Sequence, residues 1–259
     1  MKPELILLVE VTIAIIIIAL ASTAIFRLNG LVSKINVRVS RDAYVDNHAK
    51  YQVALLLLSL IVLFFSYVQN PHNLMLLLSV GDISAPADSM QWFGIGENKT
   101  WIFAGIYLSV VITLGTLSFV YIQFRKSKIC VGEILPYVGW ILLFSLTNSF
   151  SEEAIFRLGV ISPLLGELSE SSLILLSAVI FGLVHFGGMP NGLIGMLMAG
   201  FLGWFLAKSV IDTHGIFWAW FIHFIQDVVI YIGFIVGNIS AKKAINNVRG
   251  NIQGRNKQA

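Results

Sequence analysis

Long hydrophobic runs separated by short polar stretches make up most of this chain. Several runs have the length that a helix needs to cross a membrane, which takes about 20 residues. The pattern predicts seven transmembrane helices, or eight if another lies within residues 70–100. The expected spans are residues 4–26, 51–68, 101–124, 137–160, 171–186, 191–211 and 215–236. No A-x-A cleavage site follows the first run, which predicts a retained helix and not a signal peptide.

Charge differs between the connections. Residues 27–50, residues 125–128 and the tail after residue 237 are basic, whereas residues 70–100 and 162–170 are acidic. Because basic connections stay on the cytoplasmic side, we expect the three basic segments inside and the N-terminus outside. The short run Leu74–Leu78 cannot cross a membrane, and we expect it at the interface.

Composition agrees with this pattern. Hydrophobic residues make up 57% of the 259 residues and charged residues only 12%, against about 25% charged in a soluble domain. The mean hydropathy is +0.83. We therefore expect an all-α, polytopic transmembrane helical bundle in a cell membrane. The pI near 9.0 indicates topology and contact with anionic lipid, not nucleic-acid binding. The single cysteine, Cys130, excludes an intrachain disulfide and a cysteine-based metal cluster.

The chain divides into three parts by its motifs. Residues 1–130 hold transmembrane helices without a motif, residues 131–237 hold the candidate catalytic core, and residues 238–259 form a polar, basic tail that we expect to fray. Within the core, small residues recur every three or four positions, a pattern that lets another helix approach closely. This small-residue stripe consists of Gly192, Gly195, Ala199 and Gly203.

Three ionisable residues lie close together at the end of a hydrophobic run. Glu152, Glu153 and Arg157 follow residues 140–144. A charge inside a bilayer costs roughly 2.5–3.5 kcal/mol on insertion scales, so it needs a partner or a function. Residues four apart share a helix face, which predicts that Glu153 pairs with Arg157. Glu152 then points elsewhere and is the leading catalytic candidate.

Two further stretches bring histidines into the apolar helices. Phe181 lies four residues before His185, and His223 lies four residues before Asp227. At about 1.5 Å per residue, Glu152 and His223 lie roughly 12 Å below the acidic face and His185 roughly 21 Å. Allowing for errors of a few residues in the helix ends, we expect these side chains to meet at one level.

Two imidazoles with carboxylates suit a divalent metal, zinc first, held by Glu152, His185, His223 and Asp227. They equally suit a polarised water, whose proton a neighbouring carboxylate could take before attack on a carbonyl.

Structural readings stand beside these functional ones. A lone membrane histidine such as His185 can be a hydrogen-bonded packing residue, and Phe181 can pack under it. Glu153 and Arg157 can form an orienting ion pair, and His223 with Asp227 could be a proton relay. The serines of the stretch more simply satisfy backbone or glutamate groups than act as nucleophiles; they are Ser145, Ser149 and Ser151.

The three stretches resemble the signature of the CPBP family of CAAX proteases and bacteriocin-processing enzymes, also called the Abi family. That signature is E-E-x-x-x-R, then F-x-x-x-H, then H-x-x-x-N or H-x-x-x-D. Its matches are Glu152-Glu153 with Arg157, Phe181 with His185, and His223 with Asp227. The resemblance covers residues 133–237, and position 227 is Asp where the eukaryotic branch usually has Asn.

The resemblance implies an intramembrane metallo-endopeptidase of the CAAX type with an all-helical core, in a prokaryotic inner or plasma membrane. It implies that Glu152 and His185 activate water, while His223 and Asp227 stabilise the oxyanion or help to hold a metal. Glu153, Arg157 and Phe181 would support them. The implied partners are membrane lipid and a hydrophobic or lipidated, CAAX-like peptide or protein.

Two other functions fit the same residues. A non-enzymatic bacteriocin-immunity or scaffold protein would keep the fold and bind a peptide or partner. A proton-coupled transporter would use Glu152, His185 and Asp227 as a relay, but the chain shows no paired broken helices or inverted repeat. Other intramembrane proteases fit poorly, because the motifs G-x-S, G-x-G-D and H-E-x-x-H are all missing.

Overall fold

The computed structural model describes residues 3–188 and 192–256, with side chains described between residues 8 and 246 apart from residue 10. Asn191, where the sixth span is expected to begin, and the last three residues of the tail lie outside the described residues. Within this part of the chain the fold is all-α, as predicted, and seven helices are long and apolar enough to cross a membrane.

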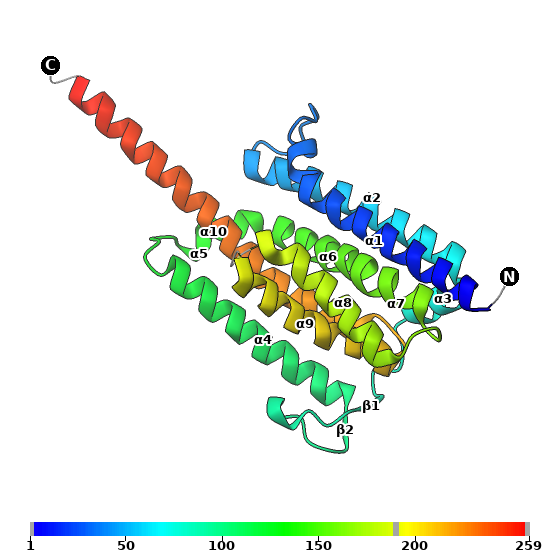
Figure 1. Ribbon diagram of the computed structural model, residues 1–259. Coiled ribbons are helices and arrows are strands. Elements are labelled where there is room, and N and C mark those ends of the chain that lie inside the picture. The colour runs from blue at the N-terminus through cyan, green and yellow to red at the C-terminus, as the bar shows by residue number, and fades with distance from the viewer. Residues whose placement is uncertain (1–2, 189–191, 257–259) are drawn as a thin grey trace.

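The elements follow one another mostly as antiparallel helices (Figure 1). The N-terminal half contains α1 (Pro3–Val32), α2 (Ala43–Gln69), α3 (Pro71–Leu78), β1 (Pro86–Ala87), the 3-10 turn η1 (Gln91–Phe93), β2 (Lys99–Thr100) and α4 (Trp101–Phe124). The C-terminal half contains α5 (Val131–Ile134), η2 (Leu135–Tyr137), α6 (Val138–Glu153), η3 (Ala154–Leu158), α7 (Gly159–Leu164), α8 (Glu170–Val184), η4 (His185–Gly187), α9 (Gly192–Thr213) and α10 (Phe217–Asn256).

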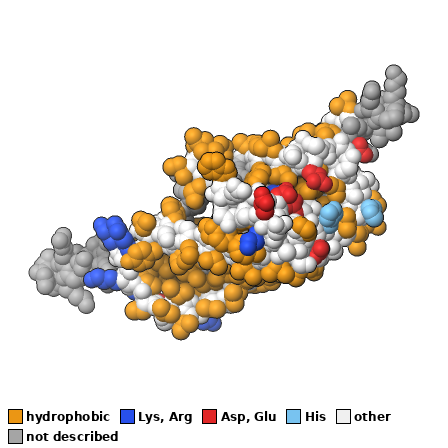
Figure 2. Space-filling model, turned by 90° about the horizontal axis from the view of Figure 1, so that it is seen from below, with side chains coloured by type: hydrophobic (Ala, Val, Ile, Leu, Met, Phe, Trp, Pro, Cys, Tyr) orange, Lys and Arg blue, Asp and Glu red, His pale blue; other side chains and the backbone are white. Residues whose placement is uncertain are grey.

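Helix α10 organises the bundle by packing against α4, α6 and α9, while α2 packs against α1 and α6. The main hydrophobic core includes the fully buried side chains of Leu55, Trp101 and Phe205. Outward-facing residues of α1, α2 and α4 are largely apolar, as expected for helices that meet lipid. Figure 2 shows one face that is mostly hydrophobic, with Asp and Glu side chains gathered away from the C-terminal end.

Helices α8 and α9 pack closely through small residues. An added Cβ on Gly203 would lie 3.3 Å from the Cα of Ala178, and one on Gly182 would lie 2.8 Å from the Met196 carbonyl oxygen. Gly203 belongs to the predicted stripe, and Gly200, which the prediction omitted, also faces Ala178. This close contact sets the position of the end of α8, where His185 lies.

The prediction that the second span begins at residue 51 is wrong, because α2 already begins at Ala43. The carboxylate of Asp42 accepts a hydrogen bond from the Tyr44 amide at 3.0 Å and caps the helix. Asp46 and Lys50, one turn apart, form an ion pair at 2.8 Å. Capping and pairing make these polar residues helical although their hydropathy does not indicate a span.

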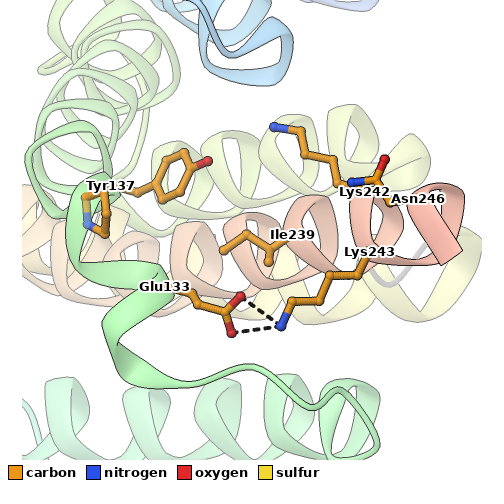
Figure 3. Close-up of a pocket in the computed structure, with 7 residues that line it drawn as sticks. Glu133, Tyr137, Ile239, Lys242, Lys243 and Asn246 are labelled. Atoms are coloured by element: carbon orange, nitrogen blue, oxygen red, sulfur yellow. Dashed lines mark hydrogen bonds and ion pairs between the residues drawn. The ribbon is translucent and has the colours of Figure 1, made fainter. Parts of the chain in front are cut away.

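The seventh span is also longer than predicted, since α10 continues beyond residue 236 to Asn256 and projects past the bundle (Figure 1). Lys242 pairs with Asp42 at 2.6 Å, and Lys243 pairs with Glu133 at 2.8 Å. Lys242, Lys243 and Glu133 line a cleft of about 380 Å³ between α10 and the η2 region (Figure 3). Burial raises the pKa of Asp42, but hydrogen bonds from Lys242 and Tyr137 outweigh it, so the pKa is lowered.

The basic segments meet at this end of the bundle. Besides these pairs, Lys243 donates to the Lys128 carbonyl at 3.1 Å, and Lys50 donates to the Ile35 carbonyl at 3.0 Å. The connections that the positive-inside rule assigns to one side of the membrane therefore lie together. Which side this is, and the placement of Leu74–Leu78 at the interface, stay predictions, as does the division into residues 1–130, 131–237 and 238–259.

A tight contact at the opposite end joins the loop after α3 to the start of α10. The Asp82 amide donates to the Thr213 carbonyl at 2.8 Å, and the Ile216 amide donates to the Ser79 carbonyl at 3.0 Å. Gly81 lies between these bonds with a φ of +73°. A Cβ at this position would lie 2.4 Å from the Thr213 carbonyl oxygen, so both the backbone conformation and the close approach require glycine.

We expect Gly81→Ala to lower the free energy of unfolding by about 1–3 kcal/mol, through backbone strain and the steric clash. Thermal unfolding of the purified protein in detergent measures this effect. Gly96→Ala is the matched control, because a Cβ at Gly96 meets no atom within 4 Å, and its transition temperature should stay close to that of the unaltered protein. Equal transition temperatures for all three proteins would contradict the prediction.

Candidate active site

Three helices bring the predicted residues together near the middle of the bundle. Glu152 comes from the end of α6, His185 follows the end of α8, and His223 lies near the start of α10. The Glu152 Oε2 atom lies 3.8 Å from His185 Nε2 and 3.6 Å from His223 Nε2. His223 Nε2 also lies 3.7 Å from Asp227 Oδ1. The convergence expected from helix depth is present, and all four predicted catalytic residues belong to one cluster.

A backbone hydrogen bond orients His185. Its Nδ1 atom lies 2.8 Å from the Phe181 carbonyl oxygen. Since a carbonyl only accepts, Nδ1 must carry a proton and donate it. In the neutral imidazole, Nε2 then keeps a free lone pair, and this is the atom that faces Glu152. The F-x-x-x-H spacing produces this arrangement directly, because the carbonyl of residue i lies beside the side chain of residue i+4 on a helix.

His223 is oriented by a carboxylate in place of a carbonyl. Its Nδ1 lies 2.7 Å from Glu153 Oε1, so Nδ1–H donates to Glu153 and Nε2 faces Glu152 and Asp227. The side chains of Glu153 and Arg157 are fully buried, and Arg157 Nε lies 3.0 Å from Glu153 Oε2. The predicted Glu153–Arg157 pair is thus present. It holds the carboxylate that orients His223.

Phe181 lies at the centre of these groups. The Arg157 guanidinium lies 4.2 Å from the centre of the Phe181 ring, an arrangement that favours a buried cation. The ring centres of Phe181 and His185 are 4.4 Å apart, and those of Phe181 and His223 are 5.8 Å apart. The contact of Arg157 Nε with Glu153 is an ion pair without hydrogen-bond geometry, and no guanidinium nitrogen makes a hydrogen bond within the described residues. The Glu153 carboxylate and the Phe181 ring therefore stabilise this buried charge.

The structure adds Asn148, to which the sequence interpretation gave no role. The Asn148 Nδ2 atom lies 3.1 Å from Glu152 Oε1 and 3.1 Å from Asp227 Oδ2. Glu152 Oε2, the other oxygen of that carboxylate, is buried without a hydrogen-bond partner in the described part of the chain. Asn148 lies four residues before Glu152, so a search for polar residues on the same helix face would have found it.

Access to the cluster is uneven. The side chains of His223 and Asp227 are each 5% exposed, whereas that of Glu152 is 14% exposed and that of His185 is 31% exposed. The cluster is therefore most open at Glu152 and His185. His223 and Asp227 form its buried side.

The donor chemistry of this cluster suits a metal, but its arrangement does not complete a metal site. Imidazole nitrogens and carboxylate oxygens are zinc ligands, and metal-binding histidines usually donate their other N–H to an oxygen. However, no group of three or more His, Cys, Asp or Glu within residues 3–188 and 192–256 could hold a metal ion. Donor separations of 3.6–3.8 Å exceed the roughly 3.3 Å between ligands that share one zinc ion. The predicted zinc stays a prediction.

Comparison with known families bears on the same region. Residues 134–229 match the family model for the Rce1-like type II CAAX prenyl endopeptidases. The predicted family resemblance is confirmed. This Rce1-like segment contains all three motifs, from Glu152 to Asp227, while α1, α2 and α4 lie outside it. Comparisons with curated proteins and with solved structures give no significant match. The family match and the seven spanning helices support a CAAX-type intramembrane protease.

Proposed function

We propose that this protein is an intramembrane endopeptidase that hydrolyses a peptide bond in a hydrophobic or lipidated, CAAX-like substrate. The observation that carries the proposal is the buried Oε2 atom of Glu152. It has no hydrogen-bond partner among the described residues and faces the Nε2 atoms of two histidines. A carboxylate oxygen held in this way is placed to accept a proton.

In the proposed reaction, a water molecule binds between Glu152 Oε2 and His185 Nε2. Glu152 takes one proton from this water as its oxygen attacks the substrate carbonyl carbon. The carbonyl π bond opens and the carbonyl oxygen becomes an oxyanion. When the intermediate collapses, the C–N bond breaks and the proton on Glu152 passes to the leaving nitrogen. The products are a carboxylic acid and an amine.

His223 and Asp227 act on the buried side of the site. The Asp227 Oδ1 atom lies 3.7 Å from His223 Nε2, and Asp227 Oδ2 accepts from Asn148. Asp227 thus places negative charge beside the imidazole and need not contact the oxyanion, which it would repel. The carboxylates of Glu153 and Asp227 lie beside His223 and would stabilise a positive charge on its imidazole. An imidazolium N–H at Nε2 would in turn stabilise the oxyanion.

A divalent metal at Glu152, His185, His223 and Asp227 would polarise the carbonyl or the water when bound. No step above depends on it. Metal analysis of the purified protein, compared with the His185→Ala variant, measures whether these residues bind zinc.

The direct test is cleavage of a fluorescence-quenched, prenylated CAAX peptide by the protein in liposomes. We expect cleavage by the unaltered protein and a loss of about 10²-fold in kcat for His185→Ala, because the variant removes the Nε2 atom that holds the attacking water in place. His72→Ala replaces an exposed histidine of α3 and is the matched control. Normal cleavage by Glu152→Ala and His185→Ala would end the protease proposal and favour a non-enzymatic immunity or scaffold role.

A further inference from the structure

A chain of buried hydrogen bonds joins α2 to the active site. The Gln52 side chain of α2 donates through Nε2 to Asn148 Oδ1 at 3.2 Å. Asn148 in turn donates through Nδ2 to Glu152 and Asp227, each at 3.1 Å. Gln52 is only 4% exposed and Asn148 is 9% exposed. Gln52 lies outside the Rce1-like segment, in the N-terminal half of the chain, which carries none of the three family motifs.

The direction of these bonds matters because a primary amide has one donor end and one acceptor end. Asn148 must turn its NH₂ group toward the two carboxylates, since the reversed amide would place Oδ1 against their negative oxygens. In the observed orientation, Oδ1 points toward α2 and needs a donor of its own. Gln52 supplies that donor, so it holds the Asn148 amide in the orientation that both carboxylates require.

Gln52 is itself held from two sides. Its Nε2 donates to the Tyr231 hydroxyl at 2.8 Å, and Thr147 Oγ1 lies 3.0 Å from its Oε1. The Tyr231 hydroxyl can in turn donate a hydrogen bond to His48 Nε2, which lies 3.0 Å away. Buried polar networks of this kind are rigid when their members are satisfied and costly when they are not. The amide of Gln52 therefore has little freedom to turn.

As a result, the two oxygens of each carboxylate have different partners. The Asn148 NH₂ group occupies Oε1 of Glu152 and Oδ2 of Asp227. The remaining oxygens, Oε2 of Glu152 and Oδ1 of Asp227, both face His223 Nε2. One amide group thus decides which atom of Glu152 is free to act as the base.

We propose that Gln52 is a positioning residue for the reaction, acting through Asn148 to aim Glu152 Oε2 at the reacting water and to keep Asp227 Oδ1 turned toward His223. The first half of the chain then supplies a required part of the site. This inference rests on the proposed function. It concerns kcat more than KM, because Gln52 lies behind Asn148 and not in the exposed part of the site at Glu152 and His185.

The test compares Gln52→Leu, Asn148→Ala and the double variant in the peptide-cleavage assay. Loss of an orienting partner typically costs 10–100-fold, so we expect each single variant to lower kcat by about that factor with KM changed less than about twofold. Because Gln52 acts through Asn148, the double variant should be no slower than Asn148→Ala alone. Two effects that multiply in the double variant would overturn the inference, because they would show independent roles.

Gln52→Met is the second variant, used if the leucine variant is not recovered in folded form. Methionine has nearly the length and volume of glutamine but no N–H group to donate to Asn148 Oδ1, so kcat should again fall at least tenfold. Unchanged kcat for this variant would overturn the inference. Ser59→Ala is the control on the same helix, since the Ser59 hydroxyl donates to the Leu56 carbonyl of α2 at 2.8 Å, and its kcat should not change.

Thermal unfolding of each variant separates loss of positioning from loss of fold, because a positioning defect lowers kcat in a protein whose unfolding transition is preserved. The outcomes also separate the two proposals. If Glu152→Ala and His185→Ala abolish cleavage while the Gln52 variants keep full kcat, only the positioning role fails. If Glu152→Ala and His185→Ala cleave normally, the protease function itself fails.

Discussion

Replacing Glu152 with glutamine should lower kcat for peptide cleavage by about 10²–10⁴-fold, the usual contribution of a general base. The substitution preserves the size of the side chain, and the glutamine Oε1 can still accept the bond from Asn148. The Oε2 atom becomes an NH₂ group, which cannot take a proton from water. A single-turnover assay with saturating prenylated peptide measures the cleavage step directly.

The control for this variant is Glu167→Gln, which changes an exposed glutamate in the turn between α7 and α8. We expect unaltered kcat for this control, and unfolding transitions close to that of the unaltered protein for both variants. A Glu152→Gln protein that cleaves at the normal rate would show that another group accepts the proton.

Replacing Arg157 with methionine should lower the free energy of unfolding by about 3–5 kcal/mol, the usual result of breaking a buried ion pair. The variant leaves the Glu153 carboxylate fully buried without its cation and removes the guanidinium from the face of Phe181. Denaturant or thermal unfolding in detergent micelles gives the magnitude.

The double variant Glu153→Gln with Arg157→Met should recover much of this stability, because no uncompensated charge remains buried. It should not recover activity: a glutamine can still accept from His223 Nδ1, which lies 2.7 Å from Glu153 Oε1, but it lacks the negative charge that would stabilise the His223 imidazolium. A single Arg157→Met variant as stable as the unaltered protein would contradict the ion-pair argument. A fully active double variant would contradict the role given to Glu153.

Interactions within one helix were readable from sequence. Glu153 and Arg157 lie four apart, as do Phe181 and His185, and this spacing alone predicted which groups share a face. Hydrophobic runs likewise predicted seven spans. The misjudged ends of α2 and α10 share one cause: both contain polar residues that hydropathy does not assign to a span. Capping and ion pairs hold these residues in helical form, as in Asp46 with Lys50 within α2 and Asp42 with Lys242.

Contacts between helices were beyond sequence reasoning, because amide and hydroxyl residues in a membrane helix have several possible partners. Gln52 and Tyr231 carry no motif, and only the packing of α2, α6 and α10 places them beside Asn148. Helix depth predicted that Glu152, His185 and His223 reach one level, but not which atoms face each other. That information comes from the bonds to Phe181 and Glu153.

The helix that carries Glu152 is not uniform. Between α6 and α7 it forms a π-helical turn, η3 (Ala154–Leu158), at the E-E-x-x-x-R motif itself, where sequence predicted a continuous α-helix. A π turn adds one residue to the local winding. This offset rotates α7 relative to α6 by about 100°, the angle between neighbouring residues.

The helix faces of α6 and α7, on either side of η3, are therefore set independently of each other. The α6 half presents Asn148 and Glu152 toward α10 and α2, while the α7 half packs against α1, α2 and α8. An uninterrupted α-helix could not direct both the α6 face and the α7 face toward these neighbours. Because of the extra residue, the direction of the catalytic side chains on α6 does not fix which face of α7 packs against its neighbours. Substitutions that alter the chemistry and substitutions that alter the packing can therefore occur independently on this helix.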